Sequence, residues 1–427
     1  MMLDRKTPPV IHDAVDFDYV LPAITTEKLK NGIPFYWLNA GVQDVVQIDW
    51  VFPAGLWYEE KEAVSQAVAG QMKNGTSTRS AKEINEALEF YGASLKVSPG
   101  SDNSSVTLYT LTKHLPNVLP IVFEVLTDAV FPQEELDIYK QNSLQRLQVN
   151  LRQCDFVANQ KIDAALYDEH HPYGRFSKKE TIEALTREDL SAFYKKHFDL
   201  SCATIFMAGN VGVAEVKYMN EVFGNVAITA TETEPRVYGG KSTADKKQNI
   251  TNDPNGVQAA IRIARHFPNR HHPDFAPMVV LNTLYGGYFG SRLMSNIREE
   301  KGYTYGIHSS LLPMKNGGMM TISTEVGRDV LEPAVKEIYK EMEIMCNELA
   351  DDEELLLVKN YLLGNLLGDL DGPFSILQRW RTLILNGLTI EHFNRNINIY
   401  KTITAKDLQE LAQKYFIADD FYEVVVV

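Results

Sequence analysis

Two groups of side chains in this sequence carry functional groups that could take part in chemistry. The run Asp168-Glu169-His170-His171 combines carboxylates with imidazoles, which are side chains that bind zinc. Adjacent histidines at a chain reversal rarely act as paired ligands, so we favour a structural role for this run. Arg298 and Tyr305 flank Gly302, and a guanidinium and a phenol can both donate hydrogen bonds to an oxyanion. On spacing alone, the better interpretation is a solvated helix charge at Arg298 and a core aromatic at Tyr305.

Length, composition and charge predict a folded protein that binds neither nucleic acid nor membrane. The chain has 427 residues, of which 44% are hydrophobic, and this length corresponds to about two to three globular domains. Its formal net charge is −14 and it contains no run rich in Lys or Arg. Nucleic-acid binding depends on neutralising phosphates, so this class of partner is excluded. No stretch approaches the roughly 18 apolar residues of a membrane-spanning helix.

The cysteines and the first residues predict a cytoplasmic location. Cys154, Cys202 and Cys346 are odd in number and widely spaced, which fits a reducing compartment better than a disulfide framework. The segment Met1–Val20 mixes charged residues and prolines without an apolar core, so it does not have the pattern of a signal peptide.

An internal repeat with a period of a little over two hundred residues organises the chain. Thr186-Arg-Glu-Asp-Leu190 matches Thr404-Ala-Lys-Asp-Leu408, and in both the Thr and the Asp predict a helix N-terminus resembling a capping box. Val118-Leu-Pro120 matches Leu331-Glu-Pro333, and we expect both prolines in the first helical turn, where a missing N–H costs nothing.

The strands that surround these helices also occur twice and predict an α+β fold. Val106–Leu111 and Met320–Thr324 alternate in polarity as strands do, and Val46–Phe52 corresponds to Gly256–Ile263. We therefore expect two homologous domains, each a mostly antiparallel sheet with helices packed on one face. The expected limits are residues 1–226 and 256–427, joined by a polar linker at 227–255 with little periodicity.

Several short motifs, in this order and spacing, resemble the zinc metallopeptidases of the pitrilysin, insulysin and mitochondrial processing peptidase family (the inverzincins), and specifically its short-chain bacterial branch. The resemblance covers nearly the whole chain from about Leu29, and it implies that the two domains form half of a clamshell around a chamber that a second such chain completes. The motifs are Leu29-Lys-Asn-Gly-Ile33, Phe52-Pro-Ala-Gly55, Asn74-Gly-Thr76 with Arg79, His171-Pro-Tyr-Gly-Arg175 and Arg298-Glu-Glu-Lys-Gly-Tyr-Thr-Tyr-Gly306.

The resemblance also shows that the zinc site of the family is missing from this sequence. Active members carry H-x-x-E-H just before the Asn-Gly-Thr segment, with two histidine ligands and a glutamate base. Here Gln66 and Gly70 stand in the histidine positions and Ala69 stands in the position of the base. The third ligand falls near Arg146, whose permanent charge would repel a cation. The resemblance therefore implies a degenerate site with no metal bound by this chain.

Other parts of the family's machinery are partly retained. Arg298 and Tyr305 match the arginine and tyrosine that active complexes bring to the zinc site from their C-terminal domain, so with the resemblance we favour a functional role for both. Locally, Ser291–Lys301 predicts a helix, Gly302 its left-handed cap, and Tyr303–Ser309 the following strand. The strand that receives peptide by β-addition in active members matches Tyr91–Val97, where Lys96 departs from the family pattern.

A glycine-rich segment precedes this helix, and it has two interpretations. In the processing peptidase a loop at the matching place touches substrate, which makes Gly286, Gly287 and Gly290 weak candidates for substrate binding. The segment is short here, and a simple turn between helices is an equally good interpretation.

These observations predict the non-catalytic subunit of a heterodimeric zinc metalloendopeptidase acting on peptides. Its zinc and base would belong to a homologous subunit with an intact H-x-x-E-H, and this chain would lend Arg298 and Tyr305. One alternative is a catalytically inert structural or peptide-binding homodimer. Another is a hydrolase with a relocated metal, for instance at His170 and His171.

Overall fold

The computed structural model describes residues 12–228 and 236–427 of the chain. A first, six-stranded sheet has the order β1-β2-β6-β3-β5-β4, in which only β2 and β6 run parallel. Its strands are β1 (Thr25–Lys28), β2 (Pro34–Asn39), β3 (Val45–Phe52), β4 (Ser94–Ser98), β5 (Ser104–Leu111) and β6 (Thr204–Gly209).

A second, five-stranded sheet has the order β7-β11-β8-β10-β9, in which only β7 and β11 run parallel. Its first strand lies inside the predicted linker 227–255, of which residues 229–235 lie outside the described part of the chain. The strands are β7 (Lys247–Ile250), β8 (Gln258–His266), β9 (Ile307–Met314), β10 (Gly317–Gly327) and β11 (Tyr422–Val426).

Helices cover one face of each sheet, as the alternation in the strands predicts. Ile48 and Trp50 of β3 are fully buried against the helices of the first half, and Ile261 and Ile263 of β8 are buried against those of the second half. The helices of the first half are α1 (Val64–Gln71), α2 (Ala81–Phe90), α3 (Leu115–Thr127), α4 (Gln133–Asn150), α5 (Cys154–Tyr167), α6 (Lys179–Glu183), α7 (Arg187–His197) and α8 (Val213–Val222). Those of the second half are α9 (Phe275–Asn282), the π-helices η5 (Thr283–Gly287) and η6 (Met294–Glu300), α10 (Leu331–Asn347), α11 (Asp352–Asp369), α12 (Pro373–Leu385), α13 (Ile390–Thr402) and α14 (Ala405–Tyr415).

The predicted α+β fold is confirmed, and so are both repeated capping boxes. Thr186 accepts from the Asp189 amide at 3.2 Å while Asp189 accepts from the Thr186 amide at 2.8 Å, and Thr404 and Asp407 form the same pair of bonds. The expectation for Pro120 is wrong, because α3 begins at Leu115 and Pro120 lies inside it. The N–H that Pro120 lacks would have bonded to the backbone oxygen of Pro116, and this oxygen instead accepts a bond from the Tyr218 hydroxyl at 2.9 Å, while α3 packs on the sheet.

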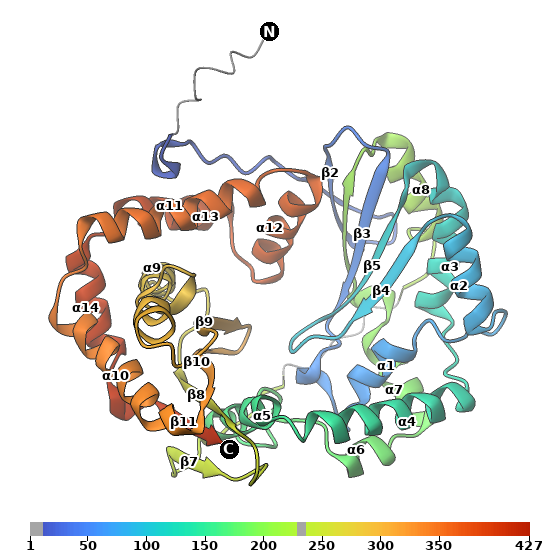
Figure 1. Cartoon of the computed structure of the whole chain (residues 1–427). Helices are drawn as coiled ribbons and strands as arrows, with labels where there is room; N and C mark the ends of the chain where they lie inside the picture. The colour runs from blue at the N-terminus through green and yellow to red at the C-terminus, as the bar shows by residue number, and fades with distance from the viewer. Residues whose placement is uncertain (1–11, 229–235) are drawn as a thin grey trace, which may run out of the picture.

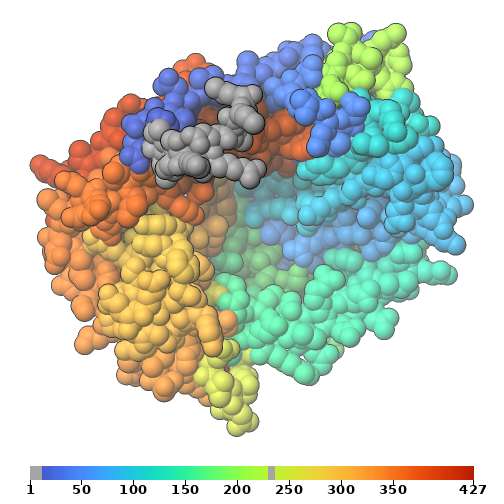
Figure 2. Space-filling view, turned by 45° about the horizontal axis from the view of Figure 1, so that its top comes forward, coloured from blue at the N-terminus to red at the C-terminus, as the bar shows by residue number. Residues whose placement is uncertain are grey.

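Each half also lends one helix to the other half, which the sequence did not predict. The helix α12 packs on the face of the first sheet that carries Phe206 and Ala208, opposite the face that carries Ile205 and Met207. In the same way α5 packs on the face of the second sheet that carries Ala260 and Val424. Figure 1 shows the result as a ring-like arrangement with α12 and α5 between the two sheets, and Figure 2 shows a hollow between the two halves.

An ion pair to a buried strand residue links each of the two exchanged helices to its sheet. Arg381 of α12 lies 3.3 Å from Asp49 of β3, whose carboxylate is 1% exposed and also accepts a bond from Thr107 at 2.6 Å. On the second sheet the charges are exchanged, since Arg262 of β8 pairs with Asp155 of α5. Asp49 and Arg262 each stand four residues after the first residue of their strand, so they occupy equivalent positions in the repeat.

We predict that Arg381→Ala lowers the free energy of unfolding by roughly 3 kcal/mol, because it leaves the Asp49 carboxylate buried without its cation. The double variant Asp49→Leu/Arg381→Met should lie within about 1 kcal/mol of the wild type. Urea unfolding measures both values. Lys406→Ala, which breaks the exposed pair with Glu410, is the control and should change stability by less than about 0.5 kcal/mol. If the double variant were as unstable as Arg381→Ala, the instability could not be assigned to a buried Asp49 carboxylate without its cation.

A second prediction concerns Asp163 of α5, which faces Arg262. Burial raises its pKa from 3.8 to about 7, against the opposing charge of Arg262. The folded state therefore holds a proton that the unfolded state releases, so this group's contribution to stability falls as the pH rises from about 4 to 7 and stays low above 7. Asp163→Asn should remove this contribution and gain roughly 1–3 kcal/mol over the wild type at pH 8, with little gain at pH 4. Denaturation of both proteins from pH 4 to pH 8 measures the difference in their stability. An equal difference at pH 4 and pH 8 would contradict the prediction.

Candidate functional site

The predicted zinc site lies where α1 packs against α4, and it contains no group of metal-binding type at the expected positions. Gln66 and Gly70 are exposed on α1, whereas Ala69 is buried in its packing surface. Arg146 is exposed on α4. The structure thus brings the two helices together as the resemblance implies, with an amide, a methyl group, a glycine and a guanidinium in place of ligands and base.

An aromatic ring fills the space beside Gly70. A Cβ atom added to Gly70 would lie 3.0 Å from Cε2 of Tyr139 on α4, which is tighter than ordinary van der Waals contact. Tyr139 and Arg146 are seven residues apart, or two helical turns, so they share one face of α4. Burial raises the pKa of the Tyr139 phenol. Tyr139 was not predicted from the sequence, although its spacing from Arg146 was visible there.

A carboxylate buried beside α1, that of Glu59, holds the helix in place. Glu59 accepts bonds from the amide and hydroxyl of Ser65 at 2.9 and 2.6 Å and pairs with Arg175 at 3.3 Å. Burial raises the pKa of Glu59, and the bonds from Ser65 and Arg175 act in the opposite direction. Because its oxygens are engaged, Glu59 positions the start of α1 and is a poor substitute for a ligand or base.

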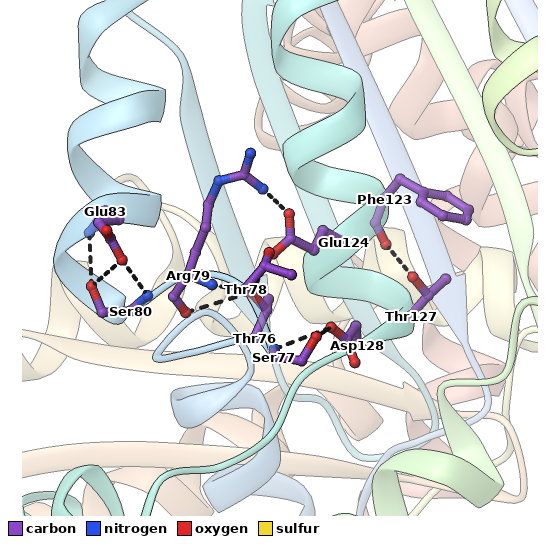
Figure 3. A network of polar contacts seen from close by, with 10 residues as sticks. All are labelled: Thr76, Ser77, Thr78, Arg79, Ser80, Glu83, Phe123, Glu124, Thr127 and Asp128. Atoms are coloured by element: carbon purple, nitrogen blue, oxygen red, sulfur yellow. Dashed lines mark hydrogen bonds and ion pairs between the residues drawn. The ribbon is translucent and has the colours of Figure 1, made fainter.

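The motif that follows α1 is also structural. Glu124 of α3 accepts from the hydroxyls of Thr76 and Thr78 and forms an ion pair with Arg79, and Figure 3 shows these side chains converging on the one carboxylate. Gly75 has φ +153° and lies so close to Pro132 that a side chain would clash. These residues fix the end of α1, which explains the Asn-Gly-Thr motif without any catalytic role.

The His-Pro-Tyr-Gly-Arg motif joins the two halves. The Tyr173 hydroxyl donates to Asp102 at 2.5 Å and accepts from the Asn316 amide at 3.2 Å, in the turn between β9 and β10. Asp102 also accepts from the amide of Lys315 at 2.9 Å. This motif therefore ties the first sheet's loop to the second sheet.

The two adjacent histidines do not form a metal site with their surroundings. His171 is buried and stacks on Tyr167 at 5.2 Å, and its Nδ1 accepts from the Tyr173 amide at 3.1 Å. Burial, and next the charge of Arg175, lower its pKa. His170 is exposed. Within residues 12–228 and 236–427, no three His, Cys, Asp or Glu side chains gather as a metal site would require.

Arg298 and Tyr305 lie close together on the surface of the second half. The Arg298 Nε donates to the backbone oxygen of Tyr305 at 3.1 Å, and the guanidinium lies 4.7 Å above the ring of Phe289. The Tyr305 side chain is 96% exposed, so the interpretation of it as a core aromatic is wrong. Within the described residues, no hydrogen bond or ion pair links this pair to α1 or α4. Phe289 was not predicted, because no sequence pattern links this turn residue to Arg298.

The backbone around this pair differs in part from the prediction. Gly302 has φ +64°, which confirms the left-handed cap. The preceding helix is a π-helix over its last seven residues, and the strand begins at Ile307, four residues later than expected. Thr304 causes the delay, because its hydroxyl donates to Gly306 O at 2.9 Å and accepts from the Gly306 amide at 3.1 Å. This local turn takes the place of the β-ladder hydrogen bonds that were expected before Ile307.

Of the three candidate glycines, Gly286 has a packing explanation. It is buried in η5, and a Cβ atom there would lie 2.7 Å from the Cβ of Ser309 and 2.8 Å from Leu293. Gly287 and Gly290 are exposed, although a Cβ atom would lie 3.1 Å from the Asn282 backbone oxygen at Gly287 and 2.8 Å from the Tyr288 ring at Gly290. The interhelical turn is therefore sufficient to explain Gly286, and a binding role for the other two stays a prediction.

The strand expected to add a peptide is at the edge of the first sheet. β4 pairs only with β5, and Lys96 is exposed on it. The Lys73 ammonium, just after α1, donates to the backbone oxygen of Leu95 at 3.3 Å. A bound peptide would have to displace this contact.

Comparison with known proteins identifies the family. Residues 39–175 match the family described as "Insulinase (Peptidase family M16)", and residues 184–362 match "Peptidase M16 inactive domain". A protein of Rickettsia felis named "Uncharacterized zinc protease" is 26% identical over 80% of this chain and 82% of its own. A zinc protease of Bacillus subtilis is 22% identical over 75% of this chain and 77% of its own. The chain belongs to the M16 peptidase family.

Solved structures share the fold over nearly the full length. The "peptidase M16 inactive domain" of Pseudomonas fluorescens has a TM-score of 0.86 at 20% identity and covers 94% of this chain and 98% of its own. A protease of Helicobacter pylori has a TM-score of 0.86 at 16% identity, with 95% and 100% covered. A chain of Complex III2 from Candida albicans has a TM-score of 0.74 at 14% identity, with 95% and 96% covered. No helix in the described parts of the chain is long and apolar enough to cross a membrane.

The contact between Gly70 and Tyr139 yields a prediction about the lost site. Gly70→His should lower the free energy of unfolding by roughly 1–3 kcal/mol, because the imidazole must displace the Tyr139 ring. In a chain that already carries Tyr139→Ala, the Gly70→His change should lower the free energy of unfolding by less than it does when Tyr139 is present. Gly368→His is the control, since Gly368 lies on α11 and a Cβ atom added there would meet nothing within 4 Å. Chemical unfolding measures all three variants, and equal losses for Gly70→His and Gly368→His would refute the contact.

Proposed function

We propose that this chain is the non-catalytic subunit of a heterodimeric zinc metalloendopeptidase. It completes the peptide chamber, and a homologous subunit with an intact H-x-x-E-H supplies the zinc and the general base. The observation that carries this proposal is the contrast between two places in the chain. Tyr139 crowds the ligand position at Gly70 and Arg146 stands at the third ligand position, whereas Arg298 and Tyr305 lie on the surface with a free phenol and a partly exposed guanidinium.

The chemistry of Arg298 and Tyr305 suits this role. Zinc-assisted peptide hydrolysis places negative charge on the former carbonyl oxygen, and two hydrogen-bond donors can stabilise it. The guanidinium is held by the Tyr305 backbone and by Phe289, so it is oriented before any partner arrives. The Tyr305 hydroxyl makes no hydrogen bond with any described residue, so it is available to an incoming group.

The names of relatives support the substrate class. Proteins of Rickettsia felis and Bacillus subtilis that resemble this chain are named zinc proteases. Because this chain shares their fold and lacks the family's ligands, the proposal requires that another chain supplies the zinc. We therefore place the cofactor in the partner and assign peptides as the substrates of the pair.

The test is peptide hydrolysis by a mixture of this chain with an M16 homologue that carries H-x-x-E-H. We expect activity only in the mixture. Arg298→Ala should lower kcat by about 10²–10³ with a smaller change in KM, because the lost interaction forms mainly in the transition state. Tyr305→Phe should also lower kcat. Arg152→Ala, which changes another exposed arginine, is the control and should leave the rate unchanged.

Three results would contradict the proposal and indicate what replaces it. If the partner alone cleaves peptides as fast as the mixture, this chain is not part of the catalyst. A stable homodimer with no affinity for a zinc-bearing homologue would favour the inert structural or peptide-binding dimer. Stoichiometric zinc in this chain alone, lost in His170→Ala/His171→Ala, would favour the relocated metal site.

A further inference from the structure

A cavity of about 460 Å³ lies inside the second half, away from the degenerate zinc site. It is enclosed by β9 and by helices α9, α11, α12 and α13, which Figure 1 shows grouped around α9. The volume is within the range of small-molecule sites, which is about 300–1,000 Å³. Neither the family's zinc chemistry nor the pair Arg298 and Tyr305 uses this space.

The charges of the cavity have one sign, although the whole chain is strongly acidic. Arg270 and Arg379 line it, and no Asp or Glu is among the described residues that do so. His392 also lines it, but burial and then the charge of Arg395 lower its pKa, which favours the uncharged imidazole. Arg379 has a partner in Asp369, whereas Arg270 forms no ion pair with any residue in 12–228 or 236–427 and rests on the Phe275 ring at 5.5 Å. A partly buried cation without a counter-ion is unfavourable, so the site favours an anion.

A phenol and an apolar wall complete the lining. Burial raises the pKa of Tyr400, while the charges of Arg379 and Arg270 act in the opposite direction, so its hydroxyl remains a hydrogen-bond donor next to both cations. Phe393, Leu383 and Ile397 form part of an apolar wall beside these groups. An anion that fits must therefore carry an apolar body, and a carboxylate is the group that an arginine binds with two parallel bonds.

The edge of the second sheet adds a backbone contact. β9 is the last strand of its sheet, and Asn282 donates to the backbone oxygen of Ser309 at 3.0 Å, which shows that this oxygen points away from β10. Because strand orientation alternates, the backbone N–H and C=O of Leu311 point the same way, and Leu311 lines the cavity. An extended peptide could therefore pair with Leu311 while its end enters the cavity.

We propose that this cavity binds a carboxylate carried on an apolar body, with Arg270 as the principal partner and Tyr400 and Arg379 beside it. Two sources share this chemistry: the C-terminus of a peptide with an apolar last residue, and a small apolar organic acid. The site does not depend on the proposed partnership, because all its lining residues belong to this chain.

Isothermal titration with matched pairs of probes tests the proposal. The peptide Ac-Gly-Ala-Phe-Leu is used with a free C-terminus and as its amide, and 4-phenylbutyrate is used beside 4-phenylbutanamide. The acid of at least one pair should bind about tenfold or more tightly than its amide. Arg270→Gln should weaken that acid by about tenfold or more, Arg270→Lys by less, and Arg152→Gln not at all.

The outcomes separate the sources and decide the proposal. Binding of the peptide acid alone assigns a peptide C-terminus, and binding of both acids shows that the carboxylate and an apolar group suffice. No acid bound at millimolar concentration, equal binding of acid and amide, or unchanged affinity in Arg270→Gln would overturn the proposal. If circular dichroism shows that Arg270→Gln does not fold, Tyr400→Phe is used in its place. Tyr400→Phe keeps the packed ring and should weaken binding of the acid probe several-fold.

Discussion

The structure depends on the exchange of α5 and α12 between its two halves. Each sheet is buried on both faces, as the continuous buried run of β3 shows, so neither sheet leaves one face to water. The helices of each half cover only one face. The second face of each sheet is covered by a helix whose sequence lies in the other half, so each half's core is complete only when both are folded. The hollow between the halves is the space that this mutual covering leaves.

The two ion pairs, each to a buried strand residue, add specificity to this exchange. Asp49 and Arg262 are equivalent in the repeat but opposite in charge, and the helix that covers each carries the complementary residue. If α5 lay on the first sheet, Asp155 would face Asp49, and if α12 lay on the second, Arg381 would face Arg262. Like charges buried together are unfavourable, so the inversion directs each helix to the sheet of the other half. Duplicated domains need such a signal, because their apolar surfaces are nearly the same.

The sequence predicted those features whose causes are local. The alternation in β3 and the Thr and Asp of the capping boxes act within a few residues, and the structure confirms both. The empty ligand positions at Gln66 and Gly70 were also readable from residue types. The exchange of α5 and α12, and the ring of Tyr139 beside Gly70, were not predictable because they join residues that are distant in the sequence. Pro120 was misplaced for a related reason, since the short match that located it was out of register with the helix start at Leu115.

Most of the motifs that carry the family resemblance have their partners inside this chain, and this separates fold from activity. Thr76 and Arg79 bind Glu124, Tyr173 binds Asp102, and Arg175 binds Glu59. Each bond fixes a loop or a helix end whether or not zinc is present, so these motifs persist without catalysis. The Tyr305 hydroxyl is different, because no described residue of the chain uses it, although its ring is held out in solvent. Arg298 bonds the backbone of Tyr305 and leaves its exposed phenol free, and this free phenol is the group that the proposed partner subunit would use.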